Sequence, residues 1–271
     1  MNNQTGISRK RFLTGSLALA GVGLSSVWQR DHAYANIAQK QGEAATTNSE
    51  DSGMRLILLG TNGGPQPNPL RSSPAQVVLV NEVPYVADCG SGVAWQLVSA
   101  GVDLTDLGYI FVTHQHSDHN LDYGNLIYQA WVSGLTTEVE TYGPPPPLKQ
   151  MTESFLELNE YDIETRIDDE SRVPLESLIQ AKEISEGGLV MEDENVSVTS
   201  ALVGHPLVEP SFAFRFDAAD RSIVISGDTN YSESLIELAQ GRTCWSTRRS
   251  TSPVWRSWWR MCPMETRSTS T

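Results

Sequence analysis

The feature that most constrains this chain is a cluster with the pattern H-x-H-x-D-H at residues 114–119, directly after an apolar run. On an extended segment His114 and His116 project to the same side, so both imidazoles can face one cation. A turn after them can bring Asp118 and His119 to a neighbouring position, and imidazole with carboxylate suits zinc and related divalent ions. Since three of the chain's five histidines lie here, the cluster predicts a metal site rather than an isolated structural histidine.

The segments before the cluster read as strands separated by glycine turns. Apolar, β-branched or alternating runs predict strands at residues 54–59, 75–80, 85–88 and 109–113. Residues 94–100 have helical character and are stopped by Gly101. These patterns alone predict a strand-rich α/β domain.

Four further motifs accompany the cluster, and together they resemble the metallo-β-lactamase superfamily. The H-x-H-x-D-H pattern after a strand is typical of that superfamily. Gly60-Thr61 resembles its first turn, Asp88-Cys89-Gly90 its second, Gly204-His205 its third-motif histidine, and residues 223–229 the strand that precedes a bridging aspartate, Asp228. The resemblance covers residues 54–241, and shorter strings at residues 58–61, 117–122, 142–144 and 226–229 are most similar to the ribonuclease Z and arylsulfatase-like branch.

This resemblance implies an αβ/βα sandwich of two mixed sheets with helices outside, C-terminally incomplete in this chain. It implies that a first metal is held by His114, His116 and His205, and a second by Asp118 and His119, with Asp228 bridging the two. The resemblance also implies two zinc ions, and two cations a few ångströms apart can share a hydroxide and make it a nucleophile near neutral pH. Asp118 is also the candidate catalytic residue, orienting or deprotonating that water.

The remaining site residues each have an ordinary structural alternative. Asp228 follows a hydrophobic strand and would otherwise be a turn or helix N-cap aspartate. His205 precedes Pro206 and would otherwise be a loop histidine. Asp88 and Asp122 are interpreted as residues that orient the ligands through hydrogen bonds or that form turns, because carboxylates often orient ligating imidazoles. Cys89 is the single cysteine of residues 53–241, so no disulfide framework is indicated.

The N-terminal end has the pattern of an export signal. Arg9-Lys10-Arg11 precedes an apolar run at residues 17–24 and an A-x-A cleavage site at residues 33–35. The segment resembles a relaxed twin-arginine signal, and the alternative is an amphipathic or anchoring helix, although the run is too short to span a bilayer comfortably. We therefore expect a signal peptide at residues 1–35, a disordered leader at 36–52 and a periplasmic or secreted protein.

The C-terminal end departs from the superfamily pattern. No histidine follows His205, whereas the dinuclear branch supplies one more near its C-terminus, so the second metal site lacks a ligand. Residues 242–271 contain four tryptophans and six arginines without helical or strand periodicity, a composition that would otherwise suggest a nucleic-acid or membrane patch. Codons compatible with residues 242–248, read in the neighbouring frame, give A-D-V-L-V-H-E. The hypothesis is that a one-base deletion near Gly241 created an aberrant, non-native tail.

The charge distribution bears on the substrate. The whole chain has a formal charge of −14, but residues 53–241 hold eight basic and twenty-eight acidic side chains. This excess of negative charge in residues 53–241 repels nucleic-acid phosphate. We therefore predict a hydrolase of a small ester, such as a phosphodiester, sulfate ester or lactone. The alternatives are ribonuclease Z-like tRNA 3′ processing and a non-catalytic or defective metal-binding protein.

Overall fold

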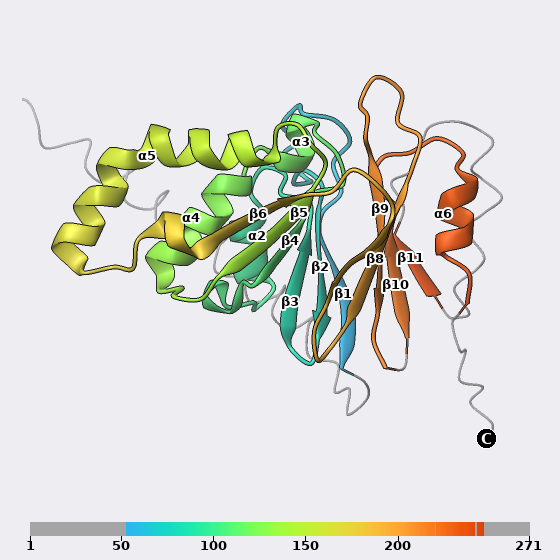
Figure 1. Cartoon of the computed structure of the whole chain (residues 1–271), viewed down its shortest axis with the longest axis horizontal. Helices are drawn as coiled ribbons and strands as arrows, with labels where there is room; N and C mark the ends of the chain where they lie inside the picture. The colour runs from blue at the N-terminus through green and yellow to red at the C-terminus, as the bar shows by residue number, and fades with distance from the viewer. Residues whose placement is uncertain (1–52, 220, 242, 247–271) are drawn as a thin grey trace, which may run out of the picture. The chain divides into compact units, whose positions relative to one another are not determined.

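A computed structural model describes residues 53–219, 221–241 and 243–246, and all of them belong to one compact unit. The expected signal peptide at 1–35, the leader at 36–52 and most of the tail at 242–271 lie outside the described residues. The described part forms two sheets that face each other, with helices on their outer sides (Figure 1).

The first sheet is mixed and has the order β1-β2-β3-β4-β5-β6. Its first three strands pair antiparallel, and β3 to β6 pair parallel. The strands are β1 (Met54–Gly60), β2 (Ala75–Val80), β3 (Val83–Ala87), β4 (Tyr109–Phe111), β5 (Val139–Gly143) and β6 (Ile179–Glu183).

The second sheet has the order β11-β10-β9-β8-β7. Strands β7 to β10 pair antiparallel, and β11 pairs parallel with β10. The strands are β7 (Gly188–Glu192), β8 (Ser197–Leu202), β9 (Phe212–Asp217), β10 (Ser222–Ile225) and β11 (Thr243–Ser246).

An aromatic core joins the two sheets. Side chains alternate along a strand, and on β9 this puts Phe212, Phe214 and Phe216 on the inner face, each fully buried. Phe111 of β4 meets Phe214 and Phe216 edge to face, with ring centroids 5.3 and 5.1 Å apart. Such aromatic pairs stabilise the fold by more than the area they bury accounts for. Here they hold β4 of the first sheet against β9 of the second.

The helices cover the outer faces of the sheets (Figure 1). Apolar side chains of α2, α4 and α5 pack on the first sheet, and α6 packs on the second through Leu235. The helices are α2 (Val93–Ser99), α3 (Ser117–Asn120), α4 (Tyr123–Ser133), α5 (Leu148–Glu170) and α6 (Glu233–Leu238), with 3-10 turns η1 (Leu104–Asp106) and η2 (Leu175–Leu178). No helix among the described residues is long and apolar enough to cross a membrane.

This architecture confirms the predicted α/β fold, with corrections at the ends of elements. The strand predicted at 85–88 is β3, which begins at Val83 and ends before Asp88, whose positive φ of 63° turns the chain. The strand predicted at 109–113 ends at Phe111, because the backbone N–H of Thr113 donates to a side chain, the carboxylate of Asp88, and not to a neighbouring strand.

The second sheet extends past the expected domain boundary at residue 241. Residues 243–246 lack strand periodicity in the sequence, yet they form β11 beside β10. Parallel pairing uses backbone groups, which every residue of the segment offers whatever its side chain. The lack of strand periodicity in this segment therefore gave no indication of β11.

Candidate metal centre

The candidate residues lie where several strands end at one edge of the sandwich. Strands β8 and β10 both run antiparallel to β9, so their carboxyl ends share one edge of the second sheet. His205 follows β8, Asp228 follows β10, and His114 follows β4 of the first sheet. The backbone N–H of Phe212 donates to the carbonyl of Thr113 at 2.8 Å, which fastens the end of β4 to the start of β9.

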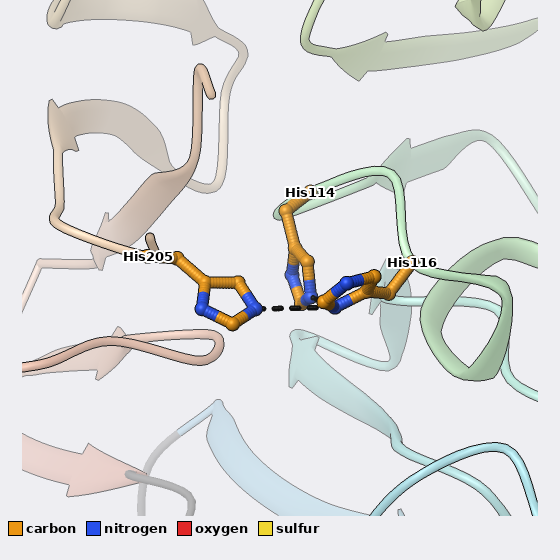
Figure 2. Close-up of side chains that lie close together, drawn as sticks. All are labelled: His114, His116 and His205. Atoms are coloured by element: carbon orange, nitrogen blue, oxygen red, sulfur yellow. Dashed lines mark hydrogen bonds between the residues drawn. The ribbon is translucent and has the colours of Figure 1, made fainter. Parts of the chain in front are cut away.

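Three histidines converge at this edge (Figure 2). Nδ1 of His116 lies 3.1 Å from Nε2 of His114 and 3.1 Å from Nε2 of His205. Around a tetrahedral zinc ion with Zn–N bonds of 2.0–2.1 Å, ligand nitrogens are about 3.3 Å apart. The three nitrogens therefore already stand close to the spacing that a zinc ion imposes, and the donor set fits such an ion.

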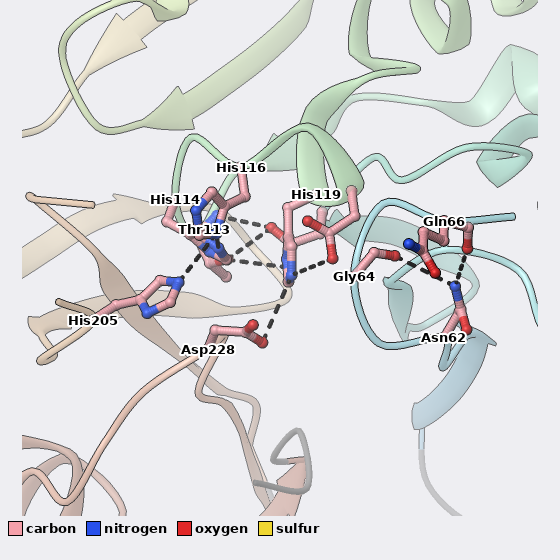
Figure 3. Close-up of polar contacts among 11 residues, drawn as sticks. Asn62, Gly64, Gln66, Thr113, His114, His116, His119, His205 and Asp228 are labelled. Carbon is pink, nitrogen blue, oxygen red and sulfur yellow. Dashed lines mark hydrogen bonds and ion pairs between the residues drawn. The ribbon is translucent and has the colours of Figure 1, made fainter. Parts of the chain in front are cut away.

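A second group of potential ligands adjoins the first. Ligand atoms of His114, His119 and Asp228 all lie within 4.8 Å of one another. Nε2 of His119 is 3.6 Å from Oδ1 of Asp228 (Figure 3). The same nitrogen is 3.8 Å from Oδ2 of Asp118. Imidazole and carboxylate together suit a divalent cation, so the arrangement can accommodate two neighbouring cations, with His114 common to both groups.

The carboxylate of Asp88 accepts hydrogen bonds from residues of this group without being one of the predicted ligands. Its Oδ2 accepts a hydrogen bond from Nδ1 of His119 at 2.7 Å. Its Oδ1 accepts from both the backbone N–H and the hydroxyl of Thr113, each at 2.9 Å. Asp88 is almost completely buried, and a buried charge is tolerated when it is hydrogen-bonded in this way. With its Nδ1 occupied, His119 presents Nε2 to the cluster.

The turn after β3 also contacts the short helix α3. The backbone N–H of Cys89 donates to the carbonyl of His119 at 2.6 Å. A Cβ on Gly90 would lie 2.4 Å from the carbonyl oxygen of Asp118 and 2.6 Å from that of Pro74. Only glycine permits so close an approach of backbones, which explains the Asp88-Cys89-Gly90 string next to the histidine cluster.

Burial sets the protonation state of the central histidine. His114 is fully buried, and desolvation, followed by the neighbouring His119, lowers its pKa to about 3. The buried carboxylate of Asp88 acts in the opposite direction but does not cancel this effect. His114 is therefore neutral near pH 7, which is the form in which an imidazole nitrogen can bind a metal.

Of the two carboxylates predicted to stand behind the ligands, only Asp88 contacts a histidine of the cluster. The carboxylate of Asp122 accepts from the backbone N–H of Gly92 at 2.7 Å and so braces the neighbouring turn. All six predicted ligands, in contrast, come together at the one edge: His114, His116, Asp118, His119, His205 and Asp228.

Two neighbours of the site were not singled out from the sequence. Thr113 is fully buried and contacts both Asp88 and His114; its position between a strand and the first histidine is the one sequence signal that could have found it. Asn62 holds the loop after β1, because its side-chain amide donates to the carbonyls of Gly64 and Gln66 (Figure 3).

Sequence comparison matches this chain to a family model and to curated proteins. Residues 54–246 match the model of the family described as "Anti-Pycsar protein Apyc1". Ribonuclease Z of Mycobacterium sp. (strain KMS) is 33% identical over 190 residues, which are 69% of this chain and 66% of that protein. The chain thus spans about two thirds of the length of that curated relative.

Two solved structures share the fold at low sequence identity. Human tRNase Z, short form, superposes with a TM-score of 0.54 at 22% identity, covering 68% of this chain and 73% of that one. The metallo-β-lactamase fold protein YhfI from Bacillus subtilis gives a TM-score of 0.53 at 18% identity, covering 70% and 68%.

Proposed function

The chain belongs to the metallo-β-lactamase superfamily, in the family described as "Anti-Pycsar protein Apyc1", and from this membership we propose that it is a metal-dependent hydrolase of a small ester. The observation that carries the proposal is the convergence of His114, His116 and His205, with a second group of His119 and Asp228 directly beside it. Such a double constellation of imidazoles and carboxylates suits two divalent cations, and we propose zinc.

Most residues of the centre would bind the cations, and one would also position the attacking water. His114, His116 and His205 would hold one cation, and His119 and Asp118 the other, with Asp228 between them. Two divalent cations held there would supply a hydroxide nucleophile at neutral pH and would stabilise the charge that develops in the transition state. Asp118 would also orient or deprotonate the attacking water, because its carboxylate lies in the cluster, 3.8 Å from Nε2 of His119.

The substrate class follows from charge and relatives together. A relative named ribonuclease Z favours phosphodiester chemistry, and we propose a small phosphodiester before a sulfate ester or a lactone. Processing of tRNA 3′ ends is the second candidate, favoured by that same relative. It is disfavoured by the segment 149–194, which carries four basic and fourteen acidic residues, because a polyanion binds poorly to such a surface.

A substrate panel tests the proposal. Purified, zinc-loaded protein is assayed with chromogenic phosphodiester, sulfate-ester and lactone substrates and with a precursor tRNA. Turnover of the phosphodiester that is abolished in His116→Ala is the expected result. Cleavage of the tRNA with no turnover of small esters would support the second candidate instead. Zinc binding without turnover of any substrate would favour a non-catalytic metal-binding protein.

We also propose that the protein is exported and that its C-terminal tail is read in a shifted frame. The signal-like residues 1–35 support the first proposal, and the family-like alternative reading of residues 242–248 supports the second. Cell fractionation with and without residues 1–35 tests export. Sequencing of the gene tests the frame, and a variant with the frame restored should bind its second cation more tightly than this chain does.

A further inference from the structure

Thr113 is the residue at which the two halves of the candidate centre meet. It is fully buried at the end of β4, and its carbonyl accepts from the N–H of Phe212 in the second sheet. A Cβ on Gly227, next to Asp228, would lie 2.7 Å from the Cβ of Thr113. Thr113 therefore contacts the turn that carries Asp228 as well as the segment that carries His114.

The hydroxyl of Thr113 has one proton, and the surrounding atoms decide where it goes. Oγ1 lies 2.9 and 3.1 Å from the two carboxylate oxygens of Asp88, which can only accept. Oγ1 also lies 3.0 Å from Nδ1 of His114. Since the proton is given to Asp88, Oγ1 must accept from His114, and Nδ1 of His114 must carry the hydrogen.

The same carboxylate fixes a second histidine. Nδ1 of His119 lies 2.7 Å from Oδ2 of Asp88, so it also carries its hydrogen on that side. The hydrogen on Nδ1 leaves Nε2 of His114 as the nitrogen that can bind a cation, and the hydrogen bond to Asp88 directs Nε2 of His119 into the cluster. Nε2 of His114 faces Nδ1 of His116 at 3.1 Å, and Nε2 of His119 faces Oδ1 of Asp228 at 3.6 Å. An imidazole nitrogen binds a metal ion through its lone pair.

We propose that Thr113 is a positioning residue that selects the Nδ1–H tautomer of His114 and, through Asp88, ties the orientation of His114 to that of His119. One chain of hydrogen bonds then prepares a ligand in each group for its cation. This inference rests on the proposed function only in so far as a cation binds there. The tautomer itself is a property of the protein without metal.

Two substitutions separate the hydroxyl from the shape of the side chain. Thr113→Val keeps the branched shape and removes the hydroxyl, whereas Thr113→Ser keeps the hydroxyl and removes a methyl group. Loss of a group that orients a ligating histidine lowers metal affinity about 10- to 100-fold. We therefore expect that loss in Thr113→Val, measured by competition with a chelator for zinc, and near wild-type affinity in Thr113→Ser.

The tautomer is read directly by ¹⁵N NMR of the histidine side chains in metal-free protein at pH 8. The expected result is Nδ1–H for His114 in the wild type and in Thr113→Ser, and a shift towards Nε2–H in Thr113→Val. An Nε2–H tautomer in the wild type would overturn the proposal, and this measurement does not depend on any variant folding. Equal zinc affinity in both variants would also overturn it.

The design distinguishes this inference from the proposed function. If wild-type protein binds zinc but hydrolyses no ester, the proposed function fails while the affinity and tautomer comparisons still decide the role of Thr113. If hydrolysis is confirmed but Thr113→Val keeps both the affinity and the tautomer, the inference fails alone.

Discussion

At the scale of single residues, Asp88 supports the candidate centre without being one of the predicted ligands. It is the acceptor for Nδ1 of His119 and for two donors of Thr113. Asp122 is a natural counterpart, since it lies near the same turn but accepts from the backbone N–H of Gly92. Substitutions at Asp88 and at Asp122 can therefore separate the loss of support for a ligand from the loss of support for a turn.

Replacing Asp88 by asparagine should weaken metal binding. An amide has one acceptor atom in place of two, so it cannot serve both Thr113 and His119, and its NH₂ group would face another donor. We expect zinc affinity to fall about 10- to 100-fold, measured by chelator competition. Asp122→Asn should leave zinc affinity near the wild-type value, and equal losses in both variants would refute the role given to Asp88.

The ligands could be predicted from the sequence because four of them lie in one hexapeptide whose spacing is itself the signal. His205 and Asp228 needed the resemblance, since nothing local distinguishes them from a loop histidine and a turn aspartate. The role of Thr113 could not be predicted even though its position is suggestive, because the contacts of its hydroxyl depend on Asp88, 25 residues away, and only the folded chain brings the two together.

At the scale of elements, the turn after β10 aims Asp228 at the histidines. Gly227 in this turn has a positive φ of 60°, and a Cβ there would lie 2.7 Å from the Cβ of Thr113. Gly64 has a positive φ of 84° as well, but a Cβ there would meet nothing within 4 Å. The two glycines thus share a positive φ, but only at Gly227 would a Cβ clash with a neighbouring residue.

Gly227→Ala should therefore be more damaging than Gly64→Ala. Both substitutions incur backbone strain of about 1–2 kcal/mol, and Gly227→Ala adds a steric clash of about 1–3 kcal/mol. We expect a lower melting temperature for Gly227→Ala by thermal unfolding, together with weaker zinc binding because Asp228 is displaced. Matching melting temperatures for the two variants would show that the close approach to Thr113 does not matter.

Element boundaries followed the sequence where alternation was strong and departed from it where tertiary contacts took over. The strands predicted at 54–59 and 75–80 appear as β1 and β2 within one residue. The long helix α5 was not predicted, because only Leu148 and Ile163 of its 23 residues are buried and the rest of the pattern is polar. Strand β11 was missed because neighbouring backbone, not side-chain periodicity, recruits it.

At the scale of the whole molecule, the described body is strongly acidic and its cations are largely neutralised by neighbours. Arg55, Arg166, Arg172, Lys182 and Arg215 each form an ion pair with a carboxylate. Because these cations are paired locally, the excess acidic groups determine the electrostatic field around the protein. Such a field opposes the approach of a nucleic-acid backbone.

Binding of tRNA should accordingly be poor. Non-specific protein–nucleic acid complexes have dissociation constants of roughly 1–100 µM at physiological salt, and we expect tRNA to bind more weakly than about 100 µM at that salt. Fluorescence anisotropy with labelled tRNA checks this, with a basic RNA-binding protein as the positive control. Low-micromolar binding that weakens steeply with salt would point to a nucleic-acid substrate after all.

The central claim is that the histidines at the ends of β4 and β8 hold a divalent cation, and metal stoichiometry tests it most directly. We predict that the folded chain, titrated with zinc and analysed by elemental analysis after gel filtration, retains at least one tightly bound zinc ion. His116→Ala and His205→Ala should each lose that ion, while alanine at His32, outside the described residues, should have no effect. A chain that retains no zinc, or retains it equally in all three variants, would contradict the account.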